Sequence, residues 1–487
     1  MLMLSRFWAN KTAAITTTLQ PHQRRAVRKA MANNLLLAHS MGSGKTLTAI
    51  AVADALNKPT TVLTPASLVE NFRKEIAKHK KGGPPIDVMS LPTAALHDYR
   101  VPKGNTLIID EAHALRNSGT ARSAYVNAQA ARAGRLLALT GTPAYNSIEN
   151  WAPLVNLAAR QPLLPETEAG FRDGYLKARR INPGFINRVF RGVKPGVSYS
   201  LAQPEKLVHK ISPYVDVFDV DVEKPSRDEE FVEVPMDPEQ AKTYKFVEGT
   251  IPAALRWKLK HNLPPSKSEA AALNSFYSGV RQVANTPAGF SITSTEPGAK
   301  LREASRRLAA AYKRDPDFRG FVYSNYLDAG VTPYGKLLEK EGIPYSKFTG
   351  ELTQKQKQAI VEDYNKGKTR VILGSGSASE GLDLKGTSMI QILEPHFNNA
   401  RLEQVIGRGI RYKSHEHLPK EKRRVIVQRY LSTLPAEKLS LLRRIFGGRV
   451  EAPTSIDQYL KSRSDEKDTL MRELKEALLK TNKEAVI

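Results

Sequence analysis

Short apolar runs, each ended by small or polar residues, recur along the chain and predict buried β-strands. Helical patterns such as Leu68–Lys78 separate them. Strands that alternate with helices predict a parallel α/β sheet, whose ligands gather at the carboxyl ends of the strands. Four such runs lie in the first third of the chain: Leu35–Ala38, Thr61–Leu63, Thr106–Ile109 and Arg135–Leu139.

The alternation of predicted strands and helices stops in the middle of the chain and then resumes. The stretch from 216 to 300 contains acid-rich Asp216–Glu233 and a helical pattern around Pro238–Glu248, which favours a mostly helical insertion and linker. We expect a first lobe over 1–215, this insertion over 216–300, a second lobe over 301–450 and a tail over 451–487. The strands predicted for the second lobe are Gly320–Ser324, Tyr345–Phe348, Thr369–Leu373, Met389–Leu393 and Arg424–Arg429.

The tail carries the pattern of one amphipathic helix. Ser455 and Gln458 are spaced as a capping box, and Leu470, Met471, Leu474 and Leu478 recur at helical spacing. The helix either packs on the second lobe or binds a protein partner.

Composition adds a preference for an anionic partner. The chain has 487 residues with 74 Lys and Arg against 49 Asp and Glu, a net charge of +25. Nucleic acid is the leading candidate, and a basic surface kept for solubility is the alternative. The absence of cysteine excludes disulfides and thiolate metal sites. No run is long enough to span a membrane, so we expect a soluble cytoplasmic protein without a membrane partner.

A phosphate-binding loop is the first candidate site. The segment His39-Ser-Met-Gly42-Ser43-Gly44-Lys45-Thr46 lies between a predicted strand and a predicted helix. Glycines let backbone N–H groups turn toward phosphate oxygens, Lys45 would hold the β and γ phosphates of ATP, and Thr46 would bind Mg²⁺. The usual pattern has glycine six residues before the lysine, where this chain has His39.

A pair of carboxylates follows a later strand. Asp110 and Glu111 end the apolar run at 106–109, where an unpaired charge would be costly and a cation is expected. Asp110 would reach Mg²⁺, and Glu111 would orient and deprotonate the attacking water. His113 is either a coupling residue or an ordinary strand-end histidine. Thr140 and Thr142 follow the next strand and offer two hydroxyls for coupling, or form a plain turn.

The second lobe offers arginines. Gln404, Arg408 and Arg411 are spaced to share one helix face, which would direct the arginines at the γ phosphate when the lobes close. We assign Arg411 as the arginine finger. Upstream, a Gly/Ser loop from Gly374 to Asp383 could touch the nucleotide ribose and a nucleic-acid backbone, or is merely flexible.

The order of these motifs resembles the superfamily-two helicases, and within them the Swi/Snf-like group that includes the poxviral nucleoside triphosphatase I type; it is also similar to phage DEAH-type helicases. The residues that carry the resemblance extend from about Leu19 to Leu460. They are Leu19-Gln-Pro-His-Gln23, Met41-Gly-Ser-Gly-Lys-Thr46, Leu139-Thr-Gly-Thr-Pro-Ala-Tyr-Asn146 and Val280-Arg-Gln-Val-Ala-Asn-Thr-Pro287.

The resemblance implies two RecA-like lobes that close on one nucleotide, and it implies further contacts. Gln23 is expected to bind adenine, with duplex or branched DNA as the usual track. No chromatin-reading module is evident, so a viral, phage or bacterial origin is more natural than a eukaryotic remodeller. The residues implied to hold the nucleic-acid backbone are Thr64, Ser67, Asn71, Thr349 and Gly350.

A basic stretch from Phe171 to Lys210 could supply additional nucleic-acid contacts. Nine Lys and Arg, among them Arg179 and Arg180, alternate with aromatic residues against only two acids. A basic surface over core aromatics is an equal alternative.

These observations together predict a DNA-dependent ATPase that moves along, remodels or unwinds DNA, with ATP and Mg²⁺ as its cofactors. A catalytically inactive nucleic-acid-binding scaffold and an RNA-directed helicase remain the alternatives. The combination of Lys45, Asp110, Glu111 and Arg411 argues against a scaffold, which would need none of them together.

Overall fold

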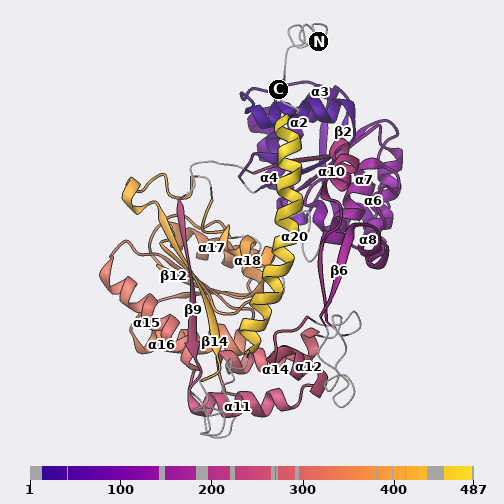
Figure 1. Cartoon of the computed structure of the whole chain (residues 1–487). Helices are drawn as coiled ribbons and strands as arrows, with labels where there is room; N and C mark the ends of the chain where they lie inside the picture. The colour runs from indigo at the N-terminus through magenta and orange to yellow at the C-terminus, as the bar shows by residue number, and fades with distance from the viewer. Residues whose placement is uncertain are drawn as a thin grey trace. The chain divides into compact units, whose positions relative to one another are not determined.

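The structure is a computed structural model, and its chain divides into two compact units. The first unit comprises residues up to Lys177, residues Ser200–Val222 and those from Thr469 onward; the second comprises Ala178–Tyr199 and Glu223–Asp468. Figure 1 shows the elements of both. The described residues are 14–40, 42–141, 148–181, 196–219, 225–264, 269, 273–290, 296–379, 382–396, 399–411, 413–435 and 454–484.

A six-stranded parallel sheet forms the centre of the first unit. In spatial order its strands are β3 (Ile86–Ser90), β2 (Thr60–Thr64), β4 (Thr106–Ile109), β5 (Arg135–Thr140), β1 (Leu35–His39) and β8 (Val215–Phe218). The helices of this unit are α2 (Pro21–Ala32), α3 (Lys45–Leu56), α4 (Val69–His79), α5 (Leu91–Leu96), α6 (Ala121–Arg132), α7 (Trp151–Ala159), α8 (Glu168–Tyr175) and α10 (Pro204–Ile211).

The first core forms because the central strands β1, β4 and β5 are mostly apolar. Leu35 and Leu37 of β1, Ile108 of β4 and Leu137 of β5 are fully buried against α2 and α3. Continuous apolar strands are typical of a parallel sheet that helices cover on both faces. The four strands predicted here are confirmed to within one residue at either end.

The second unit has a parallel sheet of the same size. In spatial order its strands are β11 (Ser346–Phe348), β12 (Val371–Gly374), β10 (Gly320–Tyr323), β13 (Met389–Ile392), β14 (Arg424–Thr433) and β9 (Ser226–Pro235). Its helices are α11 (Pro238–Gly249), α12 (Ala253–Lys260), α14 (Leu273–Asn285), α15 (Ala299–Arg314), α16 (Thr332–Lys340), α17 (Gln354–Asn365), α18 (Asn399–Ile406) and the first part of α20 (Ile456–Glu484).

Successive residues of the second sheet point into two separate cores. Val322 and Leu373 belong to one core, whereas Phe321 and Ile372, their neighbours in sequence, belong to the other. A third core joins α11, α12 and α14 to Ile456 and Tyr459 at the start of α20. The predicted fold class, two tandem parallel α/β lobes with helices, is confirmed.

The expected helical character of 216–300 is wrong at its beginning. Residues 215–218 are β8 of the first sheet, and the acid-rich residues 226–235 are β9, which pairs with β14 at an edge of the second sheet. An edge strand tolerates charged side chains because one side faces solvent, so its composition does not look like that of a buried strand.

The predicted C-terminal helix is confirmed and begins with the expected capping box. The Gln458 backbone N–H donates to Ser455 Oγ at 3.2 Å, and the Ser455 N–H donates to Gln458 Oε1 at 3.1 Å. The helix, α20, belongs to the second unit up to Asp468 and to the first unit from Thr469. Packing on the second lobe alone is therefore wrong for its later turns. No helix among the described residues is long and apolar enough to cross a membrane.

Candidate functional site

The phosphate loop connects the end of β1 to the start of α3. Gly42 and Gly44 have positive φ angles of 83° and 74°, which glycine adopts without strain. The Lys45 ammonium donates to the carbonyl oxygens of His39 at 3.0 Å and Ser40 at 3.1 Å, which holds it over the loop. The loop therefore has the predicted strand, turn and helix arrangement, with Ser43 buried inside it and Thr46 in the first turn of α3.

Gln23 lies directly against this loop. Its Oε1 accepts a hydrogen bond from the Gln20 N–H at 2.8 Å, and its Nε2 donates to the Gly44 carbonyl at 3.3 Å. A Cβ at position 44 would come within 2.6 Å of Gln23 Nε2, so glycine is required there. The side chain is only 3% exposed. The structure gives Gln23 a role in positioning the loop, and its contact with adenine stays a prediction.

The acidic pair follows β4, two strands away from β1 in the same sheet. Asp110 accepts hydrogen bonds from Thr64 Oγ1 and from the Glu111 N–H, both at 3.0 Å. Burial, and next the charge of Glu111, raise the pKa of Asp110 to about 6 although Thr64 and the Lys45 charge act in the opposite direction. The phosphate loop follows β1 and the acidic pair follows β4, so both lie at the carboxyl-terminal edge of the same parallel sheet, near enough for the Lys45 charge to act on Asp110.

Glu111 is held in an unusual backbone conformation. Its φ of 50° lies in the left-handed region, which costs a residue with a side chain about 1–3 kcal/mol and is found disproportionately at functional sites. Its Oε2 lies 3.0 Å from Nδ1 of His113. Thr140 is buried at the end of β5, the strand between β4 and β1. The predicted coupling partners His113 and Thr140 thus lie at the same edge, whereas Thr142 is outside the described residues.

Asp216 of β8 supports the phosphate loop, a role that the sequence analysis missed. Its carboxylate accepts from His39 Nε2 at 2.7 Å and from Arg25 Nε and Nη2 at 3.0 and 2.9 Å. Burial raises the pKa of Asp216, but the bonds from His39 and Arg25 outweigh it and bring the pKa to about 2. Burial lowers the pKa of His39, although the hydrogen bond to Asp216 and its charge act in the opposite direction. The signal available in the sequence was the histidine that stands in place of glycine, together with an acid, Asp216, between two valines.

The donors near the loop suit Mg²⁺ together with a nucleotide. No group of three or more His, Cys, Asp or Glu side chains that could hold a metal by itself occurs among the described residues. Mg²⁺ typically takes one or two protein oxygens and completes its shell with water and substrate phosphates. The Asp110 carboxylate and the Thr46 hydroxyl are donors of that kind. They fit the ion, and its binding is a proposal.

The arginines of the second unit are arranged differently from the prediction. Helix α18 ends at Ile406, so Gln404 is on the helix while Arg408 and Arg411 lie beyond it. The glycines at 407 and 409 disfavour helix and explain the early end. The Arg408 carbonyl accepts from the Leu384 N–H at 3.1 Å, and Arg411 Nη1 lies 3.3 Å from Asp383 Oδ1. The prediction that Gln404, Arg408 and Arg411 share one helix face is wrong. Asp383 and Arg411, both predicted site residues, form an ion pair.

A network of charged side chains fastens α18 to the sheet. Arg227 of β9 donates to both carboxylate oxygens of Glu403 on α18, at 2.7 and 2.9 Å. Arg429 of β14, only 10% exposed, donates to Glu403 Oε1 and to Asn399 Oδ1. Asn399 in turn donates to Asp468 of α20 at 2.6 Å. The sequence analysis missed this network because it placed β9 in a helical insertion.

The predicted nucleic-acid contacts differ in exposure. Ser67 (in the short helix Ala66–Leu68) and Asn71 (in α4) are exposed after β2, and Gly350 is exposed after β11. Thr64 has no exposed surface and donates a hydrogen bond to Asp110, and Thr349 is 8% exposed. Their contacts with nucleic acid stay predictions. Arg179 is exposed on β6 (Leu176–Ile181), which pairs with β7 (Gly196–Leu201); the side chain of Arg180 is outside the described set.

Two family models match adjacent parts of the chain, which together make up more than half of it. The SNF2-related domain matches residues 86–288, and the helicase conserved C-terminal domain matches residues 301–413. The chain carries an SNF2-related domain followed by a helicase C-terminal domain. The predicted superfamily-two resemblance and the predicted ATP-hydrolysing enzyme class are thereby confirmed, and the family implies ATP use and nucleic-acid binding. The SNF2-related match begins after Lys45, so the assignment of the phosphate loop depends on the loop's own sequence and geometry.

Several viral proteins are similar over most of their length to this SNF2-related chain. A candidate ATP-dependent RNA helicase of Acanthamoeba polyphaga mimivirus is 29% identical, with 92% of this chain and 94% of that protein covered. A termination factor NPH-I homolog of African swine fever virus is 24% identical over 80% of this chain and 68% of its own length. The Sulfolobus solfataricus SWI2/SNF2 ATPase core in complex with dsDNA superposes with a TM-score of 0.37 at 18% identity, covering 87% of this chain and 90% of that one.

Proposed function

We propose that this SNF2-related helicase hydrolyses ATP with Mg²⁺ and uses the reaction to move along or remodel DNA, most naturally duplex or branched DNA. The observation that supports hydrolysis most directly is the joint site in the first unit. Lys45 is held over the phosphate loop, and Asp110 and Glu111 stand at the end of β4 within its electrostatic reach. An inactive scaffold would need neither the lysine nor the buried acid.

Each group has a definite part in the proposed reaction. Lys45 and the loop N–H groups bind the β and γ phosphates, and Glu111 orients a water molecule and takes its proton as the oxygen bonds to the γ phosphorus. The bond from that phosphorus to the bridging oxygen breaks, leaving ADP and inorganic phosphate. Thr46 and Asp110 would hold Mg²⁺, which neutralises phosphate charge. Arg408 and Arg411, with Gln404, stabilise charge that develops on the transferred phosphoryl group.

The choice of DNA rests on the SNF2-related domain and on the net charge of +25. RNA is the second candidate, because the mimivirus relative bears the name of an RNA helicase. The viral relatives also favour action in virus-infected cells. The C-terminal helix as a protein-binding element remains a prediction.

One set of rate measurements separates these possibilities. ATP hydrolysis is measured without nucleic acid and with single-stranded DNA, duplex DNA, forked DNA and RNA at equal nucleotide concentration. We expect duplex or forked DNA to give the largest stimulation. Stimulation by RNA alone would replace the DNA assignment, and hydrolysis unaffected by every nucleic acid would contradict a motor. Release of a labelled strand from the fork would add strand separation to movement.

A further inference from the structure

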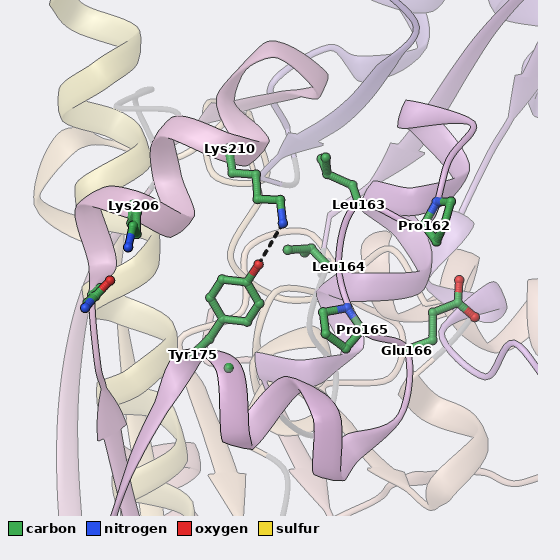
Figure 2. A pocket seen from close by; sticks show the side chains of 10 residues that line it. Pro162, Leu163, Leu164, Pro165, Glu166, Tyr175, Lys206 and Lys210 are labelled. Atoms are coloured by element: carbon green, nitrogen blue, oxygen red, sulfur yellow. Dashed lines mark hydrogen bonds between the residues drawn. The ribbon is translucent and has the colours of Figure 1, made fainter.

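A pocket of about 710 Å³ opens in the first unit beside the start of β6. Its walls are the loop Pro162–Glu166, the end of α8 with Gly174 and Tyr175, and Gln203, Lys206 and Lys210 at and in α10. Figure 2 shows the lysines and Tyr175 on one side and the proline and leucine side chains on the other. Its volume lies within the roughly 300–1,000 Å³ usual for small-molecule sites.

One part of the wall is flat and apolar. The Tyr175 ring is half-buried against Phe171, with ring centroids 5.2 Å apart, and Pro162, Leu163 and Pro165 also line the pocket. A tyrosine ring in such a setting offers a surface on which a planar aromatic group can stack.

The other part is cationic. Lys206 and Lys210 are one helical turn apart on α10, and the Lys210 ammonium donates to the Tyr175 hydroxyl at 3.1 Å, 5.8 Å from the ring centroid. Among the described residues, neither lysine is ion-paired with a carboxylate. Glu166, the acid of the lining, accepts a hydrogen bond from Asn156 Nδ2 at 3.0 Å. Exposed Lys177 follows Tyr175 at the start of β6 and adds a further positive charge.

We propose that this pocket binds one unstacked nucleotide of a nucleic-acid strand. The base stacks on the Tyr175 ring against the proline and leucine wall, and the flanking phosphates contact Lys206 and Lys210. A planar apolar surface beside two cations matches a nucleotide within a strand, because a base and its phosphates present those two chemistries at neighbouring positions. The inference rests on the proposed function, since it assumes a nucleic-acid track.

The cationic half is tested by binding of fluorescein-labelled single-stranded, forked and duplex DNA across a salt titration. Lys206→Glu and Lys210→Glu should each weaken binding about tenfold and reduce the slope of log affinity against log salt by roughly one. Lys103→Glu is the matched control, because Lys103 is an exposed lysine of the same unit that does not line the pocket. Equal effects of Lys103→Glu and the pocket variants would overturn the proposal.

The stacking half is tested with Tyr175→Leu and Tyr175→Phe. Loss of the ring should weaken binding of single-stranded and forked DNA about tenfold, whereas the phenylalanine variant should keep most of the affinity. A set of oligonucleotides, each with an abasic site at a different position, locates the stacked base. At one position of the abasic site, wild type and Tyr175→Leu should bind with equal affinity. Wild-type affinity in a folded Tyr175→Leu protein, judged by its melting temperature, would overturn base stacking.

Three further outcomes separate the pocket proposal from the proposed function. Displacement of the oligonucleotide by micromolar deoxyadenosine monophosphate in wild type, lost in Tyr175→Leu, would reassign the pocket to a free nucleotide and overturn the strand proposal. Wild-type protein that binds no nucleic acid at all would refute the proposed function itself. Normal DNA stimulation of ATP hydrolysis in the Lys206→Glu and Tyr175→Leu variants, with unchanged affinity, would refute the pocket alone.

Discussion

The strand-end region of the first unit and that of the second unit are built in different ways. In the first, Asp110 and Glu111 follow a buried strand directly, and hydrogen bonds from Thr64 and the backbone fix Asp110. In the second, Arg408 and Arg411 lie past the end of α18, and the helix itself is held by the Glu403 network. The acids proposed for the nucleotide site thus directly follow a strand of the sheet, while the position of the arginines depends on how α18 is supported.

The largest effect on ATP hydrolysis is expected at the strand-end region of the first unit. Lys45→Ala removes the cation that would hold the β and γ phosphates, so we expect ATP hydrolysis to fall at least about 1,000-fold and ATP binding to weaken. Steady-state hydrolysis and nucleotide titration measure both. Lys58→Ala is the control, because Lys58 is an exposed lysine beyond the far end of α3. Hydrolysis at the wild-type rate in Lys45→Ala would refute the assigned phosphate loop.

A comparable loss of rate with a different signature is expected in the second unit. Arg411→Ala should lower the nucleic-acid-stimulated kcat about 1,000-fold while ATP still binds, because a finger acts on charge that develops during the reaction. Lys420→Ala, which removes an exposed cation of the same unit, should leave the rate unchanged. An Arg411→Ala enzyme that loses ATP affinity but keeps its kcat would move this arginine from catalysis to binding.

The next largest effect is a loss of stability caused by a substitution in the first unit. Asp216→Asn should destabilise the protein by about 3 kcal/mol near neutral pH, because Arg25 loses its buried anionic partner and an NH2 group replaces one of the two oxygens that accept from Arg25 and His39. The pKa of Asp216 is lowered from 3.8 to about 2, so its contribution is present above about pH 4 and is lost as the pH falls through about 2.

Denaturant unfolding of both proteins near pH 7 and near pH 3 measures this loss. The difference between wild type and Asp216→Asn should shrink at the lower pH. Asp237→Asn, which breaks an exposed ion pair with Arg302, is the control and should cost about 1 kcal/mol or less. A difference that does not change with pH would contradict the buried-pair account.

The smallest effect sharpens the contrast between the two regions. Arg227→Met should lower kcat about tenfold with little change in the KM for ATP, because α18 loses its attachment to β9 and misplaces the arginines that follow it. Arg227→Lys should recover part of the rate. Arg302→Met, at an exposed pair in the same unit, should have no effect. A change in stability without any change in kcat would reduce the network to a structural role.

The fold was predictable where a strand is mostly apolar. Strands such as β1, β4 and β13 have that character, and their positions agree with the sequence pattern. The missed strands β8 and β9 contain acids whose partners, His39 and Arg25 for Asp216 and Arg429 for Glu229, lie far away in sequence. A pattern read along the chain does not show a long-range partner that neutralises a buried charge.

The candidate site was predictable in its residues but not in all of its geometry. Lys45, Asp110 and Glu111 are recognisable because they occupy fixed positions after strands. The spacing of Gln404, Arg408 and Arg411 predicts a continuous helix, whereas the glycines after Ile406 disfavour one. The structure shows that the glycines decide, because α18 ends at Ile406. The internal bonds of Gln23 and Thr64 were likewise invisible, since they depend on packing between neighbouring elements.

Hydrolysis by a Glu111→Gln variant tests the central claim most directly. A single turnover of ATP is followed at saturating DNA, after nucleotide binding has been titrated for the variant and for wild type. If Glu111 takes the proton of the attacking water, the variant binds ATP and Mg²⁺ as tightly as wild type and hydrolyses it at least about 100-fold more slowly. A variant that cleaves bound ATP at the wild-type rate would contradict the catalytic site described for this chain.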